Sequence, residues 1–167
     1  MTMAPELYVK SRLPYAQAVQ KKRGYHYLIP LTQGALESAW GQKSVGNNDF
    51  GIKDTDGING NEQLITTTEY LKTATAKFPV VIKVVRVGKL FKYTVKDWFR
   101  KYASVQLCFE DHCDFFERNP RYKEALKYKM DPDRFFEEIA KAGYATAPEY
   151  AATLKQVKQS VIKRLPK

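Results

Sequence analysis

Two glutamates, Glu37 and Glu69, stand in segments that give a carboxylate a chemical purpose. Glu37 lies in "LTQGALESAWG", residues 31–41, among apolar and small residues and close to Trp40. A carboxylate beside an indole ring loses water, which disfavours its charged form, so such a group is either paired or kept protonated for proton transfer. Glu69 follows in a separate segment, "TTTEY", residues 66–70, so the two carboxylates could face each other across a cleft.

Cleavage of a glycosidic bond is the chemistry that suits such a pair. The leaving oxygen is barely basic, so a carboxyl group with a raised pKa must deliver a proton to it. Glu37 suits the role of this general acid, and Glu69, on a different element, suits a second carboxylate that activates water or stabilises the oxocarbenium-like sugar. The alternatives are that Glu37 is a solvated or ion-paired residue at a helix end, and that Glu69 belongs to a cross-strand charge pair.

The elements that must position these residues are mostly helical. The sequence predicts a helix over residues 5–23, with a bend at Pro14 and a stop at Gly24. A second helix is expected to begin near Pro30 and to stop at Gly41, which puts the predicted acid near its C-terminal end.

A loop and a β region follow. Residues 42–61 are rich in Gly, Asn and Asp and predict a long loop, whereas residues 62–70 are β-prone. Residues 80–95 predict a hairpin that turns at Gly88-Lys89.

The remainder of the chain is expected to be helical. Ser104 can cap a helix over residues 105–118, and Asp131 followed by Pro132 opens a helix that Gly143 closes.

Thr146 and Glu149 match a capping box for a last helix. Its apolar face carries Tyr150, Leu154, Val157 and Val161. The predicted class is α+β, mostly helical, with a small β region inserted between helices.

The charge balance points to an anionic partner. The 28 Lys and Arg outnumber the 18 Asp and Glu, for a net charge of +10. Residues 77–101 hold eight of these bases and one acid, so the hairpin is a basic lobe, whereas residues 54–69 hold four acids and no base. Nucleic acid, a membrane surface and a bacterial wall polymer all qualify by charge, although no known nucleic-acid motif is present.

Several features are not expected from this sequence. Cys108 and Cys113, five residues apart on one helix, point to different faces and should not pair. The two histidines, His26 and His112, do not suggest a metal site, and no cofactor is predicted. No segment has the length of a membrane span, and no signal peptide is visible, so the protein is cytosolic, exported by another route, or a chain from which a signal was removed.

Six segments, taken in order, resemble the glucosaminidase family of peptidoglycan hydrolases, which includes bacterial autolysins and the flagellar muralytic domain. The resemblance spans about residues 5–160. The segments are "ALESAWG" (35–41), "NNDFGIK" (47–53), "TTTEY" (66–70), "FRKYAS" (99–104), "EDHCDFF" (110–116) and "GYATAPEYAATL" (143–154).

The resemblance implies a lysozyme-like fold in which a helix-borne glutamate faces a β-hairpin across a glycan-binding groove. It assigns Glu37 as the general acid, Glu69 as a supporting carboxylate and Tyr144 as a tyrosine near the acid. A core role with a satisfied hydroxyl is the alternative for Tyr144. The chain departs from the family pattern at Ala147, where Asp is usual, and in its longer hairpin at about residues 71–98.

The same resemblance suggests four residues that shape the groove. They are Trp40, Asn48, Phe50 and Gly51. For Asn48, a structural role in an Asx turn is the alternative.

The function implied is that of an endo-β-N-acetylglucosaminidase, with residues 1–167 as a single catalytic domain that acts on peptidoglycan strands in the cell envelope, periplasmic or secreted. A muramidase or a lytic transglycosylase on the same substrate and a non-catalytic wall-binding module are the alternatives. The mechanism would be inverting, with Glu69 as base, or retaining through the substrate's own acetamido group. We expect no membrane insertion, and we expect the protein to be a monomer.

Overall fold

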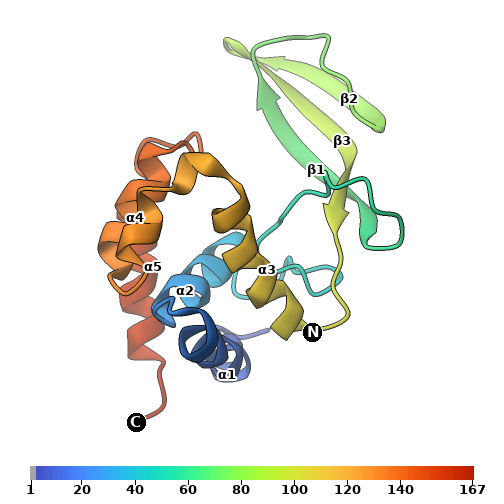
Figure 1. The fold of residues 1–167 in the computed structure, drawn as a ribbon. Coiled ribbons are helices and arrows are strands. Elements are labelled where there is room, and N and C mark those ends of the chain that lie inside the picture. The colour runs from blue at the N-terminus through green and yellow to red at the C-terminus, as the bar shows by residue number, and fades with distance from the viewer. Residues whose placement is uncertain (1–2) are drawn as a thin grey trace. The chain divides into compact units, whose positions relative to one another are not determined.

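The computed structural model describes residues 3–167, which form two compact units (Figure 1). One unit joins the residues up to Phe50 with those from Tyr102 onward, and the other spans Gly51–Lys101. The described helices all belong to the first, here called the helical unit, and the described strands to the second, the sheet unit. The predicted α+β class is confirmed.

The helical unit is organised around its second helix. Its α-helices are α1 (Pro5–Arg23), α2 (Leu28–Glu37), α3 (Val105–Arg118), α4 (Pro132–Lys141) and α5 (Tyr150–Lys163), with 3₁₀ turns at Pro120–Tyr122 and Ala125–Tyr128. α2 packs against α1, α4 and α5, and every residue from Leu28 to Ala35 is buried. A helix enclosed on all sides is typical of a core position, and Glu37 lies where α2 leaves that core.

Most helix ends follow the predicted short-range signals. Ser104 accepts a hydrogen bond from the backbone N–H of Leu107, and Asp131 accepts one from that of Arg134. Gly24 and Gly143 end helices with positive φ angles of 76° and 84°, a conformation that glycine adopts without strain.

Two predicted boundaries are wrong. α2 ends at Glu37 and not at Gly41, because the hydroxyl of Ser38 bonds to the carbonyl of Gly34 at 2.6 Å and accepts the N–H of Gly41 at 2.8 Å. The capping box is also absent: α5 begins at Tyr150 after Glu149, whose side chain makes no capping bond.

The loop after α2 is fixed to α1 by the buried carboxylate of Asp49. Arg12 donates to both of its oxygens at 2.9 and 3.2 Å, Tyr8 donates at 3.0 Å and Ser44 at 2.7 Å. Because every oxygen of this buried charge is engaged, the loop can carry Phe50 into the core.

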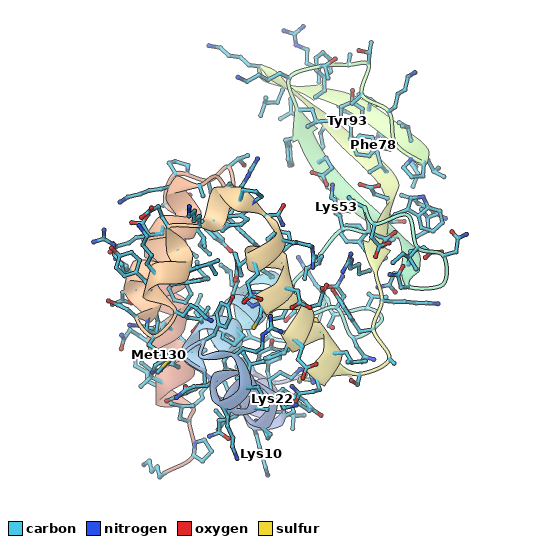
Figure 2. The ribbon with its side chains drawn as sticks, in the orientation of Figure 1. Lys10, Lys22, Lys53, Phe78, Tyr93 and Met130 are labelled. Atoms are coloured by element: carbon cyan, nitrogen blue, oxygen red, sulfur yellow. The ribbon has the colours of Figure 1, made fainter. Side chains whose placement is uncertain are left out.

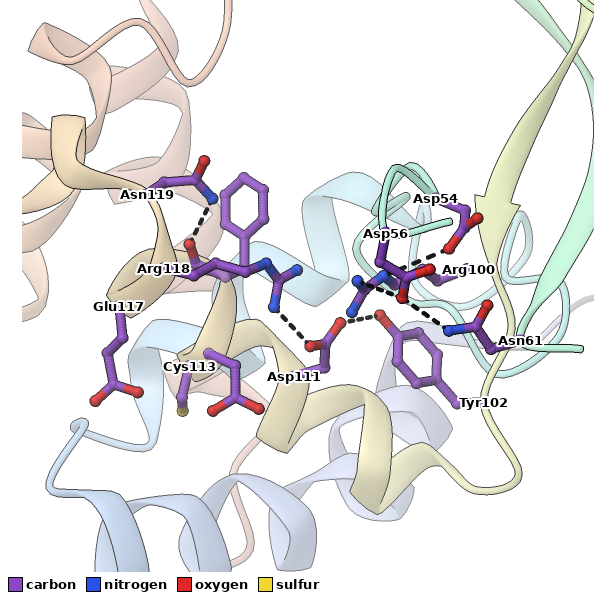
Figure 3. Close-up of polar contacts among 12 residues, drawn as sticks. Asp54, Asp56, Asn61, Arg100, Tyr102, Asp111, Cys113, Glu117, Arg118 and Asn119 are labelled. Atoms are coloured by element: carbon purple, nitrogen blue, oxygen red, sulfur yellow. Dashed lines mark hydrogen bonds and ion pairs between the residues drawn. The ribbon is translucent and has the colours of Figure 1, made fainter. Parts of the chain in front are cut away.

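The chain returns to the helical unit at Tyr102, beside that same loop. The backbone N–H of Tyr102 donates to the carbonyl of Gly46 at 2.9 Å, and the side chain of Asn47 donates to the carbonyl of Tyr102, also at 2.9 Å. Figure 3 shows the hydroxyl of Tyr102 on Asp111 of α3, at 2.6 Å, with Arg118 on the other oxygen of the same carboxylate at 2.8 Å.

The core of the helical unit also holds both cysteines. Cys108 and Cys113 are buried and unpaired, as predicted. No helix among residues 3–167 has both the length and the apolar character needed to cross a lipid bilayer.

The sheet unit is a three-stranded antiparallel sheet in the order β1–β3–β2. Its strands are β1 (Glu62–Leu71), β2 (Val80–Val87) and β3 (Leu90–Arg100), and β2 and β3 form the predicted hairpin around Gly88. Ahead of β1, the loop is ordered by Asp56, which accepts hydrogen bonds from Arg100 and Asn61, both at 2.9 Å (Figure 3).

The two faces of the sheet differ. On one face Tyr93 is buried, with its hydroxyl on the carbonyl of Thr73 at 2.6 Å and its ring against Phe78 (Figure 2). The other face is exposed, and we call it the basic face. It carries Lys83, Lys92 and Lys96, together with the rings of Tyr70 and Trp98.

Candidate functional site

Glu37, the predicted acid, is the last residue of α2 and is half-buried. The hydroxyl of Tyr150 donates a hydrogen bond to its Oε1 at 2.6 Å. Burial raises the pKa of the Glu37 carboxyl above its ordinary value, and the hydrogen bond from Tyr150 opposes part of that rise because it stabilises the ionised form. A carboxyl with a raised pKa is suited to proton donation.

Tyr150 is the functional candidate that sequence reasoning missed. It was expected only as a member of the apolar face of the last helix, yet it is the direct partner of Glu37. Burial, together with the charge of Glu37, raises the pKa of Tyr150, so the phenol remains a protonated donor. Gln33 donates in turn to the Tyr150 hydroxyl at 3.1 Å. Gln33 could have been found from its spacing in the sequence, because it lies one helical turn before Glu37 on the same face of α2.

Tyr144 lies beside this pair. Its ring stacks on that of Tyr150, with centroids 5.6 Å apart and planes 12° from parallel. Burial and the charge of Glu37 raise the pKa of Tyr144. Tyr144 also packs against Phe115 and Phe116 of α3, so it is both a neighbour of the acid and a member of the aromatic core.

The four residues expected to shape the groove lie in different surroundings. Trp40 is half-buried, with the guanidinium of Arg164 over its ring at 5.4 Å. Phe50 is only 2% exposed, and Asn48 is 5% exposed. The ring of Phe50 stacks on the ring of a buried histidine, with centroids 4.0 Å apart, which gives it a packing role. Gly51 is exposed and belongs to the sheet unit.

Glu69 lies on β1 in the sheet unit, opposite Tyr93 of β3. Its carboxylate is paired with the ammonium of Lys53 at 2.9 Å, and the same ammonium lies 3.1 Å from Asp97. Burial lowers the pKa of Lys53, but the hydrogen bonds with the two carboxylates outweigh this and raise it. Lys53 (labelled in Figure 2) and Asp97 are further members of this charged group that sequence reasoning missed.

Curated relatives match almost all of this chain, which spans about half of their length. It is 34% identical over 164 residues to the peptidoglycan hydrolase FlgJ of Vibrio parahaemolyticus, covering 95% of this chain and 48% of that protein. It is 28% identical over 155 residues to the exo-glucosaminidase LytG of Bacillus subtilis, covering 87% of this chain and 48% of that protein.

Solved structures share the fold. A C-terminally truncated glycoside hydrolase domain from Salmonella typhimurium FlgJ superposes with a TM-score of 0.71 and 29% identity, over 98% of this chain and 100% of that one. The model of the glucosaminidase family, described as mannosyl-glycoprotein endo-beta-N-acetylglucosaminidase, matches residues 13–163. The chain therefore belongs to the glucosaminidase family.

Proposed function

We propose that this protein is a glycoside hydrolase that cleaves the glycan backbone of peptidoglycan in the bacterial cell envelope, as an endo-β-N-acetylglucosaminidase. The observation that carries the proposal is the state of Glu37: a half-buried carboxyl at a helix end, with its pKa raised by burial and one oxygen held by Tyr150. Family membership and the peptidoglycan hydrolase relatives support the substrate class.

Glu37 acts as the general acid in this proposal. In its protonated form it donates to the glycosidic oxygen as the bond breaks, and the hydrogen bond from Tyr150 then stabilises the carboxylate that remains. Tyr144 stacks on Tyr150 and supports this partner of the acid. In the helical unit, Trp40 is the candidate to contact the glycan, and Phe50 and Asn48 support this role from buried positions; Gly51 is the candidate in the sheet unit.

Glu69 is the supporting carboxylate. The ion pair with Lys53, which lies in the loop before β1, holds the Glu69 carboxylate in one place. In the catalytic role Glu69 either activates water or stabilises the positive charge of the sugar, while the acetamido group of the substrate attacks.

The basic face attaches the enzyme to whole walls. Lys83, Lys92 and Lys96 lie on the face of the sheet opposite Tyr93 and Glu69, so they can hold an anionic polymer without touching the reacting bond. Exposed aromatic rings at Tyr70 and Trp98 give the same face platforms for sugar rings. The charge acts over roughly the Debye length, about 8–10 Å, so this attachment should weaken with salt.

Substitution of Glu37 tests the proposal. Glu37→Gln keeps the shape and the acceptor for Tyr150 but has no proton to give, so peptidoglycan hydrolysis should fall by about a hundred- to ten-thousand-fold. The control is Glu124→Gln, which removes an exposed carboxylate paired with Lys127 elsewhere in the helical unit.

Mass spectrometry of the digested wall identifies the bond. New reducing ends on N-acetylglucosamine support the proposal, new ends on the muramic sugar indicate a muramidase, and anhydro ends indicate a lytic transglycosylase. An unchanged rate for Glu37→Gln would refute the assignment of the acid. Binding without any product from the wild-type chain would indicate a wall-binding module.

A further inference from the structure

Four side chains of the helical unit form one hydrogen-bonded chain that ends on Glu37. Nε2 of His112 lies 2.6 Å from Oε1 of Gln33, Nε2 of Gln33 lies 3.1 Å from the hydroxyl of Tyr150, and that hydroxyl lies 2.6 Å from Oε1 of Glu37. The chain runs from α3 through α2 to α5. His112, Gln33 and Tyr150 are 1%, 0% and 6% exposed, so bulk water does not replace these bonds.

The direction of each bond follows from the state of His112. Burial lowers the pKa of His112 to about 3, so the ring is neutral near neutral pH and carries one N–H. That hydrogen is on Nε2, because Nε2 faces the amide oxygen of Gln33 and Nδ1 has no hydrogen-bond partner among the described residues. With its oxygen occupied, Gln33 presents its amide N–H to Tyr150.

The opposite direction is disfavoured by the same geometry. If the Gln33 amide were turned over, its NH₂ group would need a bare Nε2 on His112, and the ring hydrogen would move to Nδ1. There it would be a buried donor without an acceptor, which folded proteins avoid more strictly than an unused acceptor.

The hydroxyl of Tyr150 accepts from Gln33 and therefore gives its single proton to Glu37. We propose that His112 and Gln33 are positioning residues that fix Tyr150 as a donor to Oε1 of Glu37, and so leave Oε2 as the atom that carries the proton of the acid. If Tyr150 were free to accept, the proton of Glu37 would be held on Oε1, facing Tyr150, and would be unavailable to a substrate.

The inference rests on the proposed function, since it assigns the proton that Glu37 donates. In the acid step the O–H bond at Oε2 breaks, the proton goes to the leaving oxygen, and the electron pair stays on Glu37. The hydrogen bond from Tyr150 to Oε1 is already in place and stabilises the new carboxylate without any reorganisation.

The titration of Glu37 could also respond to other titratable groups of the helical unit. Tyr150 of α5 and Tyr144 before it interact electrostatically with the carboxyl. From α1, the charged pair of Arg12 and Asp49 is joined to Tyr8, whose hydroxyl lies against Gly34. A change in the titration of Glu37 therefore reports mainly on the donor at Tyr150.

Nitrogen NMR of the histidine rings tests the direction of the chain in the unmodified protein. Only two histidines are present, and His26→Gln identifies the signals of His112. We expect His112 to be neutral, with its hydrogen on Nε2, at neutral pH. A ring protonated on Nδ1, or on both nitrogens, would overturn the proposal whether or not Glu37 is the acid.

Two substitutions of His112 test the consequence for catalysis. His112→Phe keeps a ring against Phe50 but removes the donor, so Gln33 can turn its oxygen toward Tyr150. Tyr150 can then accept from protonated Glu37. The basic limb of the kcat/KM pH profile should move up by about one pH unit, and kcat should fall by about tenfold.

His112→Gln is the matched variant, because it keeps a neutral N–H donor for Gln33. Its basic limb should stay at the wild-type position. A purely structural role would lower the active fraction of both variants and leave both limbs in place, and that result would overturn the proposal. Failure of the proposed function is distinguishable, because it appears as retained activity in Glu37→Gln.

Discussion

The buried ring of His112 should make the unfolding free energy of the protein depend on pH, and one substitution can reveal this dependence. The residue is 1% exposed, and burial lowers its pKa to about 3 from an ordinary value of 6.5. Between these two values the unfolded chain binds a proton that the folded chain does not. The contribution of the neutral His112 ring to the unfolding free energy is therefore fully present above the pKa of the unfolded chain. It is lost as the pH falls from that value to about 3.

The size of the effect follows from the linkage relation. Each pH unit inside the window removes about 1.4 kcal/mol of unfolding free energy, so lowering the pH from 6.5 to about 4 should remove about 3 kcal/mol through this group. His112→Gln cannot take up the proton. At neutral pH it should be less stable than the wild type by about 1–3 kcal/mol, because it loses the ring stack on Phe50 and the edge contact with Phe116.

Urea unfolding at a series of pH values measures the difference. The gap between wild type and His112→Gln should narrow steadily below about pH 6.5 and should close or reverse near pH 4. His26→Gln is the control, since His26 is half-buried, its pKa is lowered by burial and by Lys158, and its gap should change less. A gap for His112→Gln that stays constant from neutral pH to about pH 4 would refute the neutral, buried assignment.

Three further predictions concern the second carboxylate, the basic face and the core. Glu69→Gln should reduce hydrolysis less than Glu37→Gln, and NMR of the newly cut sugar should show the α anomer first if Glu69 activates water; an equal loss, or the β anomer first, would contradict these expectations. Replacing Lys83, Lys92 and Lys96 by Gln should weaken sedimentation with whole walls by about tenfold while sparing short chito-oligosaccharides. The same change at the exposed Lys123, Lys127 and Lys141 should leave both the sedimentation with walls and the action on short substrates unchanged. An equal loss on both substrates in the basic-face variant would show that the basic face supports the active site. Gly34→Ala should lower the unfolding free energy by about 1–3 kcal/mol, because its Cβ would collide with the Tyr8 hydroxyl held by Asp49. Adding Tyr8→Phe to the same chain should recover part of the loss. Simple additivity of the two free-energy changes would argue against the collision.

Local signals in the sequence predicted the local structure well. Ser104 and Asp131 cap their helices as expected, and the hairpin turns at Gly88, because each of these features depends on residues a few positions apart. α2 ended early because the Ser38 hydroxyl competes for a helix carbonyl, and periodicity alone does not carry that choice.

The partners of the two glutamates lay beyond such signals. Tyr150 is 113 residues from Glu37 in the chain, and Lys53 reaches Glu69 from a loop that has no periodic pattern. The raised pKa of Glu37 was predictable because apolar and small residues surround it in the sequence itself. The contacts that hold its carboxylate in place were not predictable, because they exist only once α3 and α5 have packed against α2.

The hydrogen bonds that join Tyr102 to Gly46 and Asn47 have an evolutionary consequence. They bring the two ends of the inserted stretch together using atoms of the helical unit alone. Whatever lies between those ends can change in length or composition with little penalty, since each doubling of a closed loop costs only about 0.6 kcal/mol. Glu37 and the hydrogen-bonded chain that ends on it could thus be inherited unchanged while the inserted sheet is exchanged. Grafting a shorter hairpin between Phe50 and Tyr102 should therefore give a folded protein, and under the proposed function its preference among cell walls should change.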